Sequence, residues 1–464
     1  MEVGRTFSKK EQRTVLAASC VAIFITPLMA TMVNLALSTI GKDFDLTTYE
    51  EAWITVSYLL ASVVFLLAWA KVADLFGKKK IFMLGLIVTM VGAVLASMSP
   101  NFIILIVCRV IMGMGGAAIS CTSVALISEV FPRHQRGGAL GLNTAVIYLG
   151  AALGPPIGGL LTDTLGWHST FYIVVPFCLV ALLLILSFKH EFVAAKGETF
   201  DKKGAVVYGT AVIFGTFGIL NITDWYAIPC IVAGAGLLVA FYFLQKRERY
   251  PLLNIRVFSN RKYTRSVLTA LMNYGSAYAV SFFAALYLQD VNGWSATQAG
   301  AIMLIQPIIQ AAFTPLTGKL SDKIDGRILP TAGMAVTCAG LIVIFMFGEA
   351  VNTTEVILAL VLLGFGYALF SAPNTNVVMS SVSHGLYSEA SATLGTMRQA
   401  GMLLSMGIAM ACITVFMGDM THFVSSAFMD AMRAAFLICA TMSFAGIFLS
   451  WFRGNDDVLI DDAR

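Results

Sequence analysis

Two short polar signatures in the sequence each combine glycine with acidic and basic residues. One contains Asp74, Gly77 and Lys78, and the other contains Gly318, Asp322, Lys323 and Arg327. A carboxylate can cap a helix N-terminus and pair with a nearby base. Each signature can therefore hold helices together in one conformation and release them in another. We interpret both as conformational latches; the alternative is a plain turn with bases that set topology.

Two arginines lie inside long apolar segments. An arginine at the centre of a membrane helix costs about 2.5–3.5 kcal/mol on insertion scales, so Arg109 and Arg398 are expected to face protein or water. We predict a role in charge recognition; the alternative is an arginine bonded to backbone carbonyls. No Asp or Glu lies well inside an apolar segment, because Glu129, Asp163, Asp290 and Glu389 fall near segment ends. This balance favours neutral or anionic solutes.

A third pattern is rich in glycine and proline. Its members are Gly150, Gly154, Pro155, Pro156, Gly158 and Gly159. Glycines spaced by four lie on one helix face and permit close helix packing, while the prolines bend the helix. We predict that this segment is a pivot; the alternative is a packing face without motion.

Polar and aromatic residues at mid-segment positions are candidates for lining a substrate site. They are Asn34, Tyr58, Asn143, Tyr148, Asn273, Tyr274, Tyr278, Gln306, Gln310, Asn374 and Asn376. Polar groups in lipid need partners, so each fits an interhelical hydrogen bond equally well. The eight cysteines have no metal-ligand spacing, and we interpret them as packing residues. We expect neither a metal nor a cofactor.

The elements that must position these residues are membrane spans. The chain of 464 residues is 58% hydrophobic and only 12% charged, which predicts an all-α integral membrane protein. The apolar segments predict fourteen spans, at about 14–40, 52–71, 81–99, 102–125, 138–161, 169–188, 204–221, 226–244, 263–288, 297–317, 329–347, 354–380, 390–417 and 430–452. The first is too long for a cleaved signal peptide.

The distribution of bases predicts the orientation. Nearly all Lys and Arg residues fall on one side of the fourteen spans, and only Lys42 and Arg433 fall on the other. Both termini are therefore expected in the cytoplasm of a multi-pass protein of the cell membrane. Bases confined to short loops do not suit nucleic-acid binding. We divide the chain into a six-helix bundle (1–190), an inserted helix pair (191–261) and a second six-helix bundle (262–464).

These motifs resemble the major facilitator superfamily, and more closely its fourteen-span branch of drug:proton antiporters. The resemblance rests on the first latch, on Arg109 with the glycines that follow it, and on the span 5 pivot. It implies two six-helix bundles plus an inserted pair, alternating access around a central site, and protons as a coupling ion. It also implies that Arg109 lies near the proton-coupling site, and we extend the coupling or charge role to Arg398, the other embedded base. Met29 stands where the family has an acid, so the usual proton carrier is missing.

The sequence therefore predicts a secondary active transporter that exports a small organic compound, not an enzyme. One alternative is a specific metabolite or organic-anion transporter working as a uniporter or exchanger without proton antiport. The other is a membrane-embedded sensor or enzyme, which the scattered histidines and the lack of a nucleotide-binding loop disfavour. The expected partners are the small-molecule substrate and the lipid bilayer, and we expect a monomer.

Overall fold

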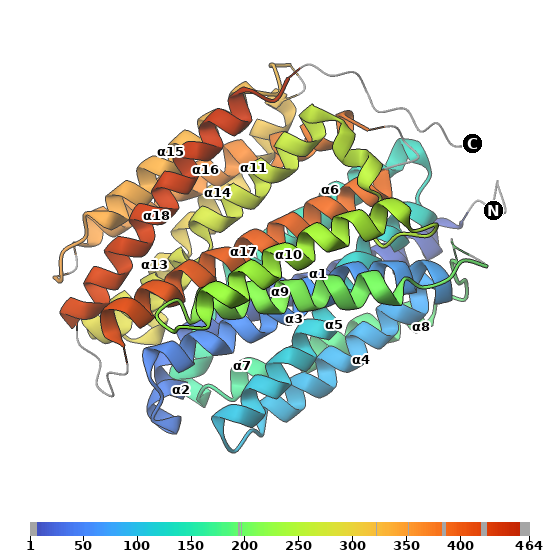
Figure 1. Cartoon of the computed structure of the whole chain (residues 1–464). Coiled ribbons are helices and arrows are strands. Elements are labelled where there is room, and N and C mark those ends of the chain that lie inside the picture. Colours follow the sequence, from blue (N-terminus) through green and yellow to red (C-terminus); the bar gives the residue numbers. More distant parts are fainter. Residues whose placement is uncertain are drawn as a thin grey trace.

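A computed structural model describes residues 7–193, 195, 197–321, 323–350, 352–382, 387–418 and 425–454. Figure 1 shows these residues as a bundle of long helices. The elements are α1 (Lys9–Met32), η1 (Val33–Leu35), α2 (Leu37–Phe44), α3 (Thr48–Phe76), α4 (Lys78–Ser97), α5 (Phe102–Val130), α6 (Arg133–Leu165), α7 (Ser169–Tyr172), α8 (Val174–Leu186), α9 (Lys202–Leu220), α10 (Ala227–Arg247), η2 (Ile255–Ser259), α11 (Arg261–Ala277), α12 (Val280–Leu286), η3 (Tyr287–Val291), α13 (Ala296–Met303), α14 (Ile305–Ser321), α15 (Ile328–Phe345), α16 (Thr353–Ser380), α17 (Tyr387–Met417) and α18 (Ser425–Trp451).

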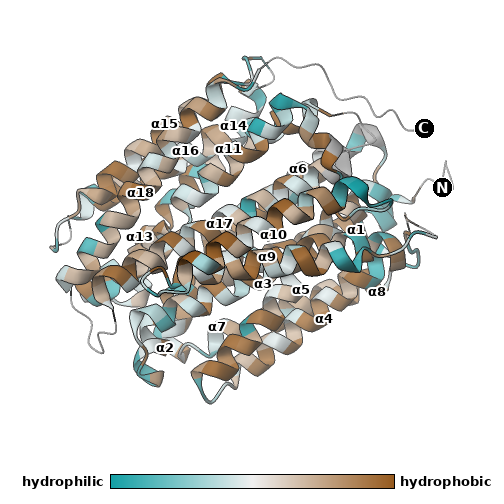
Figure 2. Ribbon diagram, in the orientation of Figure 1, coloured by the Kyte–Doolittle hydropathy of each residue, from teal (hydrophilic) through white to brown (hydrophobic). Residues whose placement is uncertain are grey.

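Fourteen helical segments are long and apolar enough to cross a membrane, so the predicted span count is confirmed. Figure 2 shows hydrophobic residues along the helices and hydrophilic residues gathered toward their ends. The first span differs from its predicted limits of 14–40. It begins at Lys9, because Ser8 and Glu11 form a capping box, and it ends at Leu35 before the separate helix α2.

Several spans are broken rather than continuous. The ninth span consists of α11, α12 and the π-helical turn η3, with Tyr278 at the first break. The tenth span breaks at Leu304 between α13 and α14. Pro307 lies just inside α14 and has no N–H to continue the hydrogen-bond ladder across this break.

Two groups of helices form the body of the protein. We call α1–α8 the first half and α11–α18 the second half. In the first half α1 packs on α6 and α5 packs on α3 and α4, while in the second half α15 packs on α16 and α18. The intervening helices α9 and α10 pack on each other, and α9 also contacts α3 and α17, so the pair covers one side of the boundary between the halves.

The boundary between the halves, which we call the seam, is formed mainly by α3 against α17 and by α6 against α13 and α14. Helix α1 begins and α18 ends at the same end of the bundle, here called the terminal end (Figure 1). Hydrogen bonds between described residues of the two halves gather at the opposite, far end: Asn34 with Ser281, Ser38 with Asp290, and Thr297 with Asp163. The seam is therefore closed at the far end.

Candidate functional site

Arg109 of α5 is fully buried against α3. Its Nε donates to the Ile54 carbonyl at 2.9 Å, and its guanidinium carbon lies 4.7 Å from the centre of the Tyr58 ring. The backbone bond and the cation–π contact hold the side chain in place. Nη1 and Nη2 have no hydrogen-bond partner among the described residues. Buried donors without partners are costly, so these nitrogens are well placed to bind an acceptor on a ligand.

Arg398 of α17 has a similar environment in the second half. Its guanidinium carbon lies 5.7 Å from the centre of the Tyr274 ring, and its Nη2 donates to Thr375 Oγ1 at 2.6 Å. Its Nε is buried without a partner among the described residues. Each half thus contributes one arginine stacked on one tyrosine.

Five tyrosines connect the two arginines across the seam. Tyr278 lies within electrostatic range of Tyr58 and Arg109, and Tyr274 lies within range of Tyr148 and Arg398. The rings of Tyr274 and Tyr367 are 5.9 Å apart. We call this group the arginine–tyrosine cluster; its members are Tyr58, Arg109, Tyr148, Tyr274, Tyr278, Tyr367 and Arg398.

Tyr367 was not among the sequence-predicted candidates. It is buried on α16 beside Gly366, at a mid-span position like those of the tyrosines that were predicted. The same criterion of an aromatic residue deep in a span would therefore have found it.

The other predicted lining residues lie elsewhere. Asn34 donates to Ser281 and accepts from Thr55, so it bridges the halves nearer the far end. The remaining polar candidates make contacts inside one half: Asn143 accepts from Ser123, Asn273 donates to Met334 Sδ, Asn374 donates to the Ser266 carbonyl and Asn376 donates to Ser321. Gln310 is buried on α14, and the Gln306 carbonyl lies against Gly364 of α16.

The glycine–proline segment of α6 makes close backbone contacts on two sides. A Cβ on Gly150 would lie 2.5 Å from the Phe24 carbonyl oxygen, and Cβ atoms on Gly154 and Gly158 would overlap atoms of Thr31 and Met32. These three glycines face α1, as their spacing predicts. A Cβ on Gly159 would instead overlap the carbonyl of Ala296 in α13, in the second half.

Pro155 and Pro156 also lie at the seam. A Cβ on Gly300 of α13 would lie 2.5 Å from the Pro155 carbonyl oxygen and 3.2 Å from the Pro156 Cα. These close approaches of α6 to the second half therefore use glycines on both sides. This contact sits at the far end, next to the hydrogen bond between Asp163 and Thr297.

The first latch signature lies at the terminal end of the first half. Lys78 Nζ is 2.5 Å from Glu129 Oε1 and 3.7 Å from Asp74 Oδ1, so one base bridges two acids. Gly77 has a φ of 120°, and a Cβ there would lie 2.5 Å from the carboxyl carbon of Glu191. Glycine is required there because φ is positive and because a side chain would displace the Glu191 carboxylate. That carboxylate accepts a hydrogen bond from the backbone N–H of Lys79 at the start of α4.

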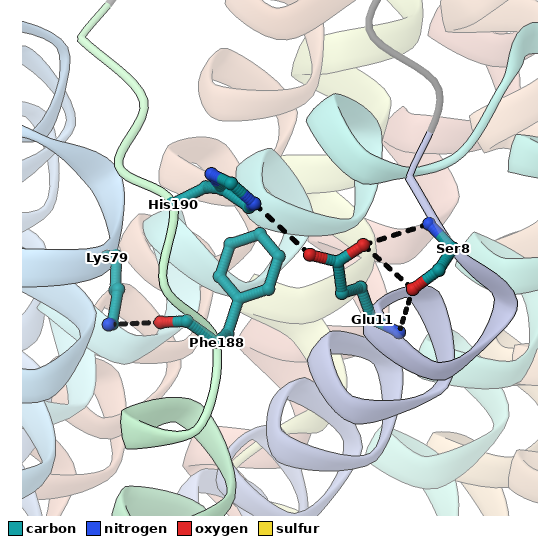
Figure 3. Close-up of polar contacts among 5 residues, drawn as sticks. All are labelled: Ser8, Glu11, Lys79, Phe188 and His190. Atoms are coloured by element: carbon teal, nitrogen blue, oxygen red, sulfur yellow. Dashed lines mark hydrogen bonds and ion pairs between the residues drawn. The ribbon is translucent and has the colours of Figure 1, made fainter.

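The segment after α8 is tied to this latch. The Lys78 N–H donates to the Phe192 carbonyl at 3.0 Å, and the Ala195 N–H donates to the Asp74 carbonyl at 3.0 Å. Figure 3 shows the adjoining contacts, in which Lys79 Nζ donates to the Phe188 carbonyl and His190 pairs with Glu11. All of these latch contacts lie within the first half and the connector that follows it.

The second latch signature is only partly described. Asp322 lies outside the described residues. Gly318 lies on α14, and Lys323 follows that helix. Arg327 Nη2 lies 2.7 Å from Oδ2 of Asp325, an acid that the sequence analysis did not include, and hydrogen bonds from Arg327 lower the pKa of Asp325.

Glu51 is a buried acid that sequence reasoning missed. The second span was predicted to begin at residue 52, whereas α3 begins at Thr48 and places Glu51 in its first turn. Only 8% of this residue is exposed, and its carboxylate lies directly against Gly41 of α2. The capping box of Thr47 with Glu50 was the sequence signal that could have placed the helix start correctly.

Two halves that meet at a seam with charged and aromatic residues at its centre are typical of membrane transporters that work by alternating access. The sequence matches the Major Facilitator Superfamily over residues 19–406 and again over residues 266–459, and the chain belongs to this family. It is a secondary transporter, not an enzyme, and a multi-pass membrane protein.

Several relatives are similar in sequence to most of this chain. The multidrug resistance protein Stp of Mycobacterium tuberculosis is 28% identical over 86% of this chain and 75% of its own. The riboflavin transporter RibZ of Clostridioides difficile is 26% identical over 96% and 98%. Multidrug resistance protein 3 of Bacillus subtilis is 26% identical over 82% and 76%.

Solved structures agree with the fold. A bacterial homologue of the lysosomal transporter Spinster, in an inward-facing and unoccupied conformation, has a TM-score of 0.70 at 17% identity and covers 96% of this chain and 98% of its own. A D-xylose–proton symporter has a TM-score of 0.68 at 12% identity over 96% and 98%.

Proposed function

We propose that this transporter exports a small, neutral or anionic aromatic compound that binds at the arginine–tyrosine cluster. The observation that carries the proposal is the pair of stacked arginines on opposite sides of the seam, with unpartnered guanidinium nitrogens and no carboxylate in the cluster. Tyrosine faces suit a planar ring, and unpartnered N–H groups suit carbonyl, phenolate or carboxylate oxygens.

Export is supported by two considerations. The glycine–proline segment resembles the signature of antiporters, and two relatives named above are multidrug resistance proteins. With the termini in the cytoplasm, a seam closed at the far end is an inward-facing state, in which a compound enters the cluster from the cytoplasm. The latches would then engage the second half only in the outward-facing state.

A specific metabolite transporter is the second candidate. The riboflavin transporter RibZ is similar to this chain over nearly the whole length of both proteins. Riboflavin is a neutral planar compound of the proposed class. The absence of an acid at Met29 also favours this candidate, because it removes the natural counter-ion of a cationic drug.

The test is a thermal-shift screen of purified protein with ethidium, riboflavin and an aromatic carboxylate. Ligand binding raises apparent stability by mass action, so a ligand at 100 times its Kd should stabilise the protein by about 2.7 kcal/mol. We expect riboflavin or the carboxylate to stabilise the wild-type protein but not the Arg398→Gln variant. Stabilisation by ethidium alone would contradict the proposed substrate class.

Efflux from proteoliposomes then separates the two candidates. An exporter coupled to protons loses activity when the pH gradient is collapsed, whereas a uniporter or exchanger keeps it. Asn143→Ala is a suitable control variant, because Asn143 is buried and its side chain accepts a hydrogen bond from Ser123 within the first half.

A further inference from the structure

A buried arginine without a charge partner follows the last helix. Arg453 lies just beyond Trp451, the last residue of α18, and none of its side chain is exposed. Its Nε, Nη1 and Nη2 atoms are all buried without a hydrogen-bond partner among the described residues. Burial lowers the pKa of Arg453 to about 9, so the side chain is still charged at neutral pH. Because buried charges are normally paired, this side chain is suited to binding an anion.

Two other helices begin beside the end of α18. Arg265 of α11 donates to the Phe452 carbonyl, and Thr331 of α15 donates to Ser450 Oγ at 2.8 Å. The N-terminus of a helix carries a partial positive charge, and the first turns of α11 and α15, which the structure describes in full, contain no acid. The two helix starts, Arg265 and Arg453 therefore favour negative charge at the same place.

The acid just before α15 does not neutralise this positive charge. Oδ2 of Asp325 lies 2.7 Å from Nη2 of Arg327, and Nε of the same arginine lies 3.1 Å from both carboxylate oxygens. The guanidinium fork of Arg327 therefore occupies this acid. The first turn of α11 adds two further bases, Arg261 and Lys262. These described residues together carry a net positive charge.

Large apolar side chains at the same helix ends are exposed. Trp451 is 51% exposed, Phe452 is 62% exposed, and Ile328, the first residue of α15, is 45% exposed. Aromatic residues at the end of a span lie where acyl chains meet headgroups, and basic pockets between spans bind anionic headgroups at that level. This combination suits a phosphate attached to acyl chains, because a soluble anion would leave the apolar surface without a contact.

We propose that Arg453 binds the phosphate of an anionic phospholipid at the terminal end of the second half. Its guanidinium fork can donate to two phosphate oxygens, and Arg265 adds a second charge beside it. Because Arg453 lies beyond the end of α18, its long side chain can turn toward the headgroup without unwinding the helix. The bound lipid then joins the starts of α11 and α15 to the end of α18. This inference does not rest on the proposed function.

The test is a titration of the full-length purified protein in detergent, followed by native mass spectrometry, which gives the dissociation constant of the first bound lipid. The probes are phosphatidylglycerol, phosphatidylcholine with the same acyl chains, and glycerol 3-phosphate, which has the phosphate without the chains. We expect the wild-type protein to bind phosphatidylglycerol at least about tenfold more tightly than either other probe. Arg453→Gln should weaken that binding by about tenfold, because charge-assisted hydrogen bonds to the phosphate are lost.

Arg247→Gln is the matched control, because it removes the same single charge from an exposed arginine in the last turn of α10. It should bind phosphatidylglycerol within about twofold of the wild-type protein, since solvent screens an exposed charge. Arg265→Gln should weaken binding as Arg453→Gln does, which keeps the test usable if Arg453→Gln does not fold.

Three results would overturn the lipid site. One is equal weakening in Arg247→Gln and Arg453→Gln, which would show a general attraction to bases. Another is unchanged binding in both Arg453→Gln and Arg265→Gln. The third is glycerol 3-phosphate or phosphatidylcholine binding as tightly as phosphatidylglycerol, which would assign the site to a soluble anion or to lipids of any charge.

Discussion

An alanine at Gly159 tests whether the α6–α13 contact controls the transport conformation. Its Cβ would overlap the Ala296 carbonyl oxygen, 2.7 Å from the carbonyl carbon and 3.0 Å from Thr297 Cα. Backbone atoms cannot move aside like a flexible side chain, so the variant must separate the two helices. Overpacking of this kind costs about 1–3 kcal/mol.

This penalty destabilises the conformation with the closed seam, not the folded state as a whole. Gly159 contacts the second half, and that contact is lost when the far end opens. A penalty of about 1–3 kcal/mol therefore shifts the ratio of closed to open seam by about 5- to 150-fold toward the open form. Nitroxide labels at Thr164→Cys in α6 and Glu349→Cys after α15, two exposed positions at the far ends of opposite halves, report this ratio by electron spin resonance in a background without accessible native cysteines.

Gly150→Ala is the matched control, because it adds the same methyl group to the same helix. Its Cβ would lie 2.5 Å from the Phe24 carbonyl oxygen and 3.0 Å from Pro27 Cγ, both within the first half. It should lower the thermal stability and leave the ratio of closed to open seam unchanged. If Gly159→Ala lowers stability equally and leaves the ratio unchanged, the contact is static packing and the pivot interpretation is wrong.

Three further predictions concern topology, the latch and charge. A cysteine replacing Thr199 should be labelled only from the cytoplasm, and one replacing Thr223 only from outside; labelling of both from outside would refute the orientation. Asp74→Asn should reduce turnover more than about tenfold, while the substrate affinity measured by calorimetry changes only a few-fold. The affinity should persist because Glu129 still pairs with Lys78 in the observed state. Collapse of affinity in a folded variant would contradict the latch. Met29→Asp should shift thermal stabilisation toward cationic compounds, and an unchanged preference would refute the charge argument.

The sequence was sufficient to predict the spans, because apolar length is a property of each segment alone. It was not sufficient to place their breaks. Tyr278 and Leu304 lie inside apolar windows, and hydropathy does not register a change of helical hydrogen bonding at these positions. Pro307 was the available signal for the second break.

The candidate site was predicted in its members but not in its grouping. Both arginines and four of the tyrosines were recognisable as mid-span polar or aromatic residues. Their stacking within each half, and the meeting of the two arginine–tyrosine pairs at the seam, depend on which helices pack together. Glu51 was missed for a related reason. It falls at a span end, where an acid ordinarily faces water, and only the packing of α2 against α3 buries it.

In the proposed function the arginine–tyrosine cluster offers donors and ring faces to a solute, and each half supplies one arginine with one tyrosine. A solute that contacts both arginines would therefore bridge the seam. Under this proposal the far end of the seam, where Asn34 bonds Ser281 and Asp163 bonds Thr297, would have to open before the solute could leave on that side.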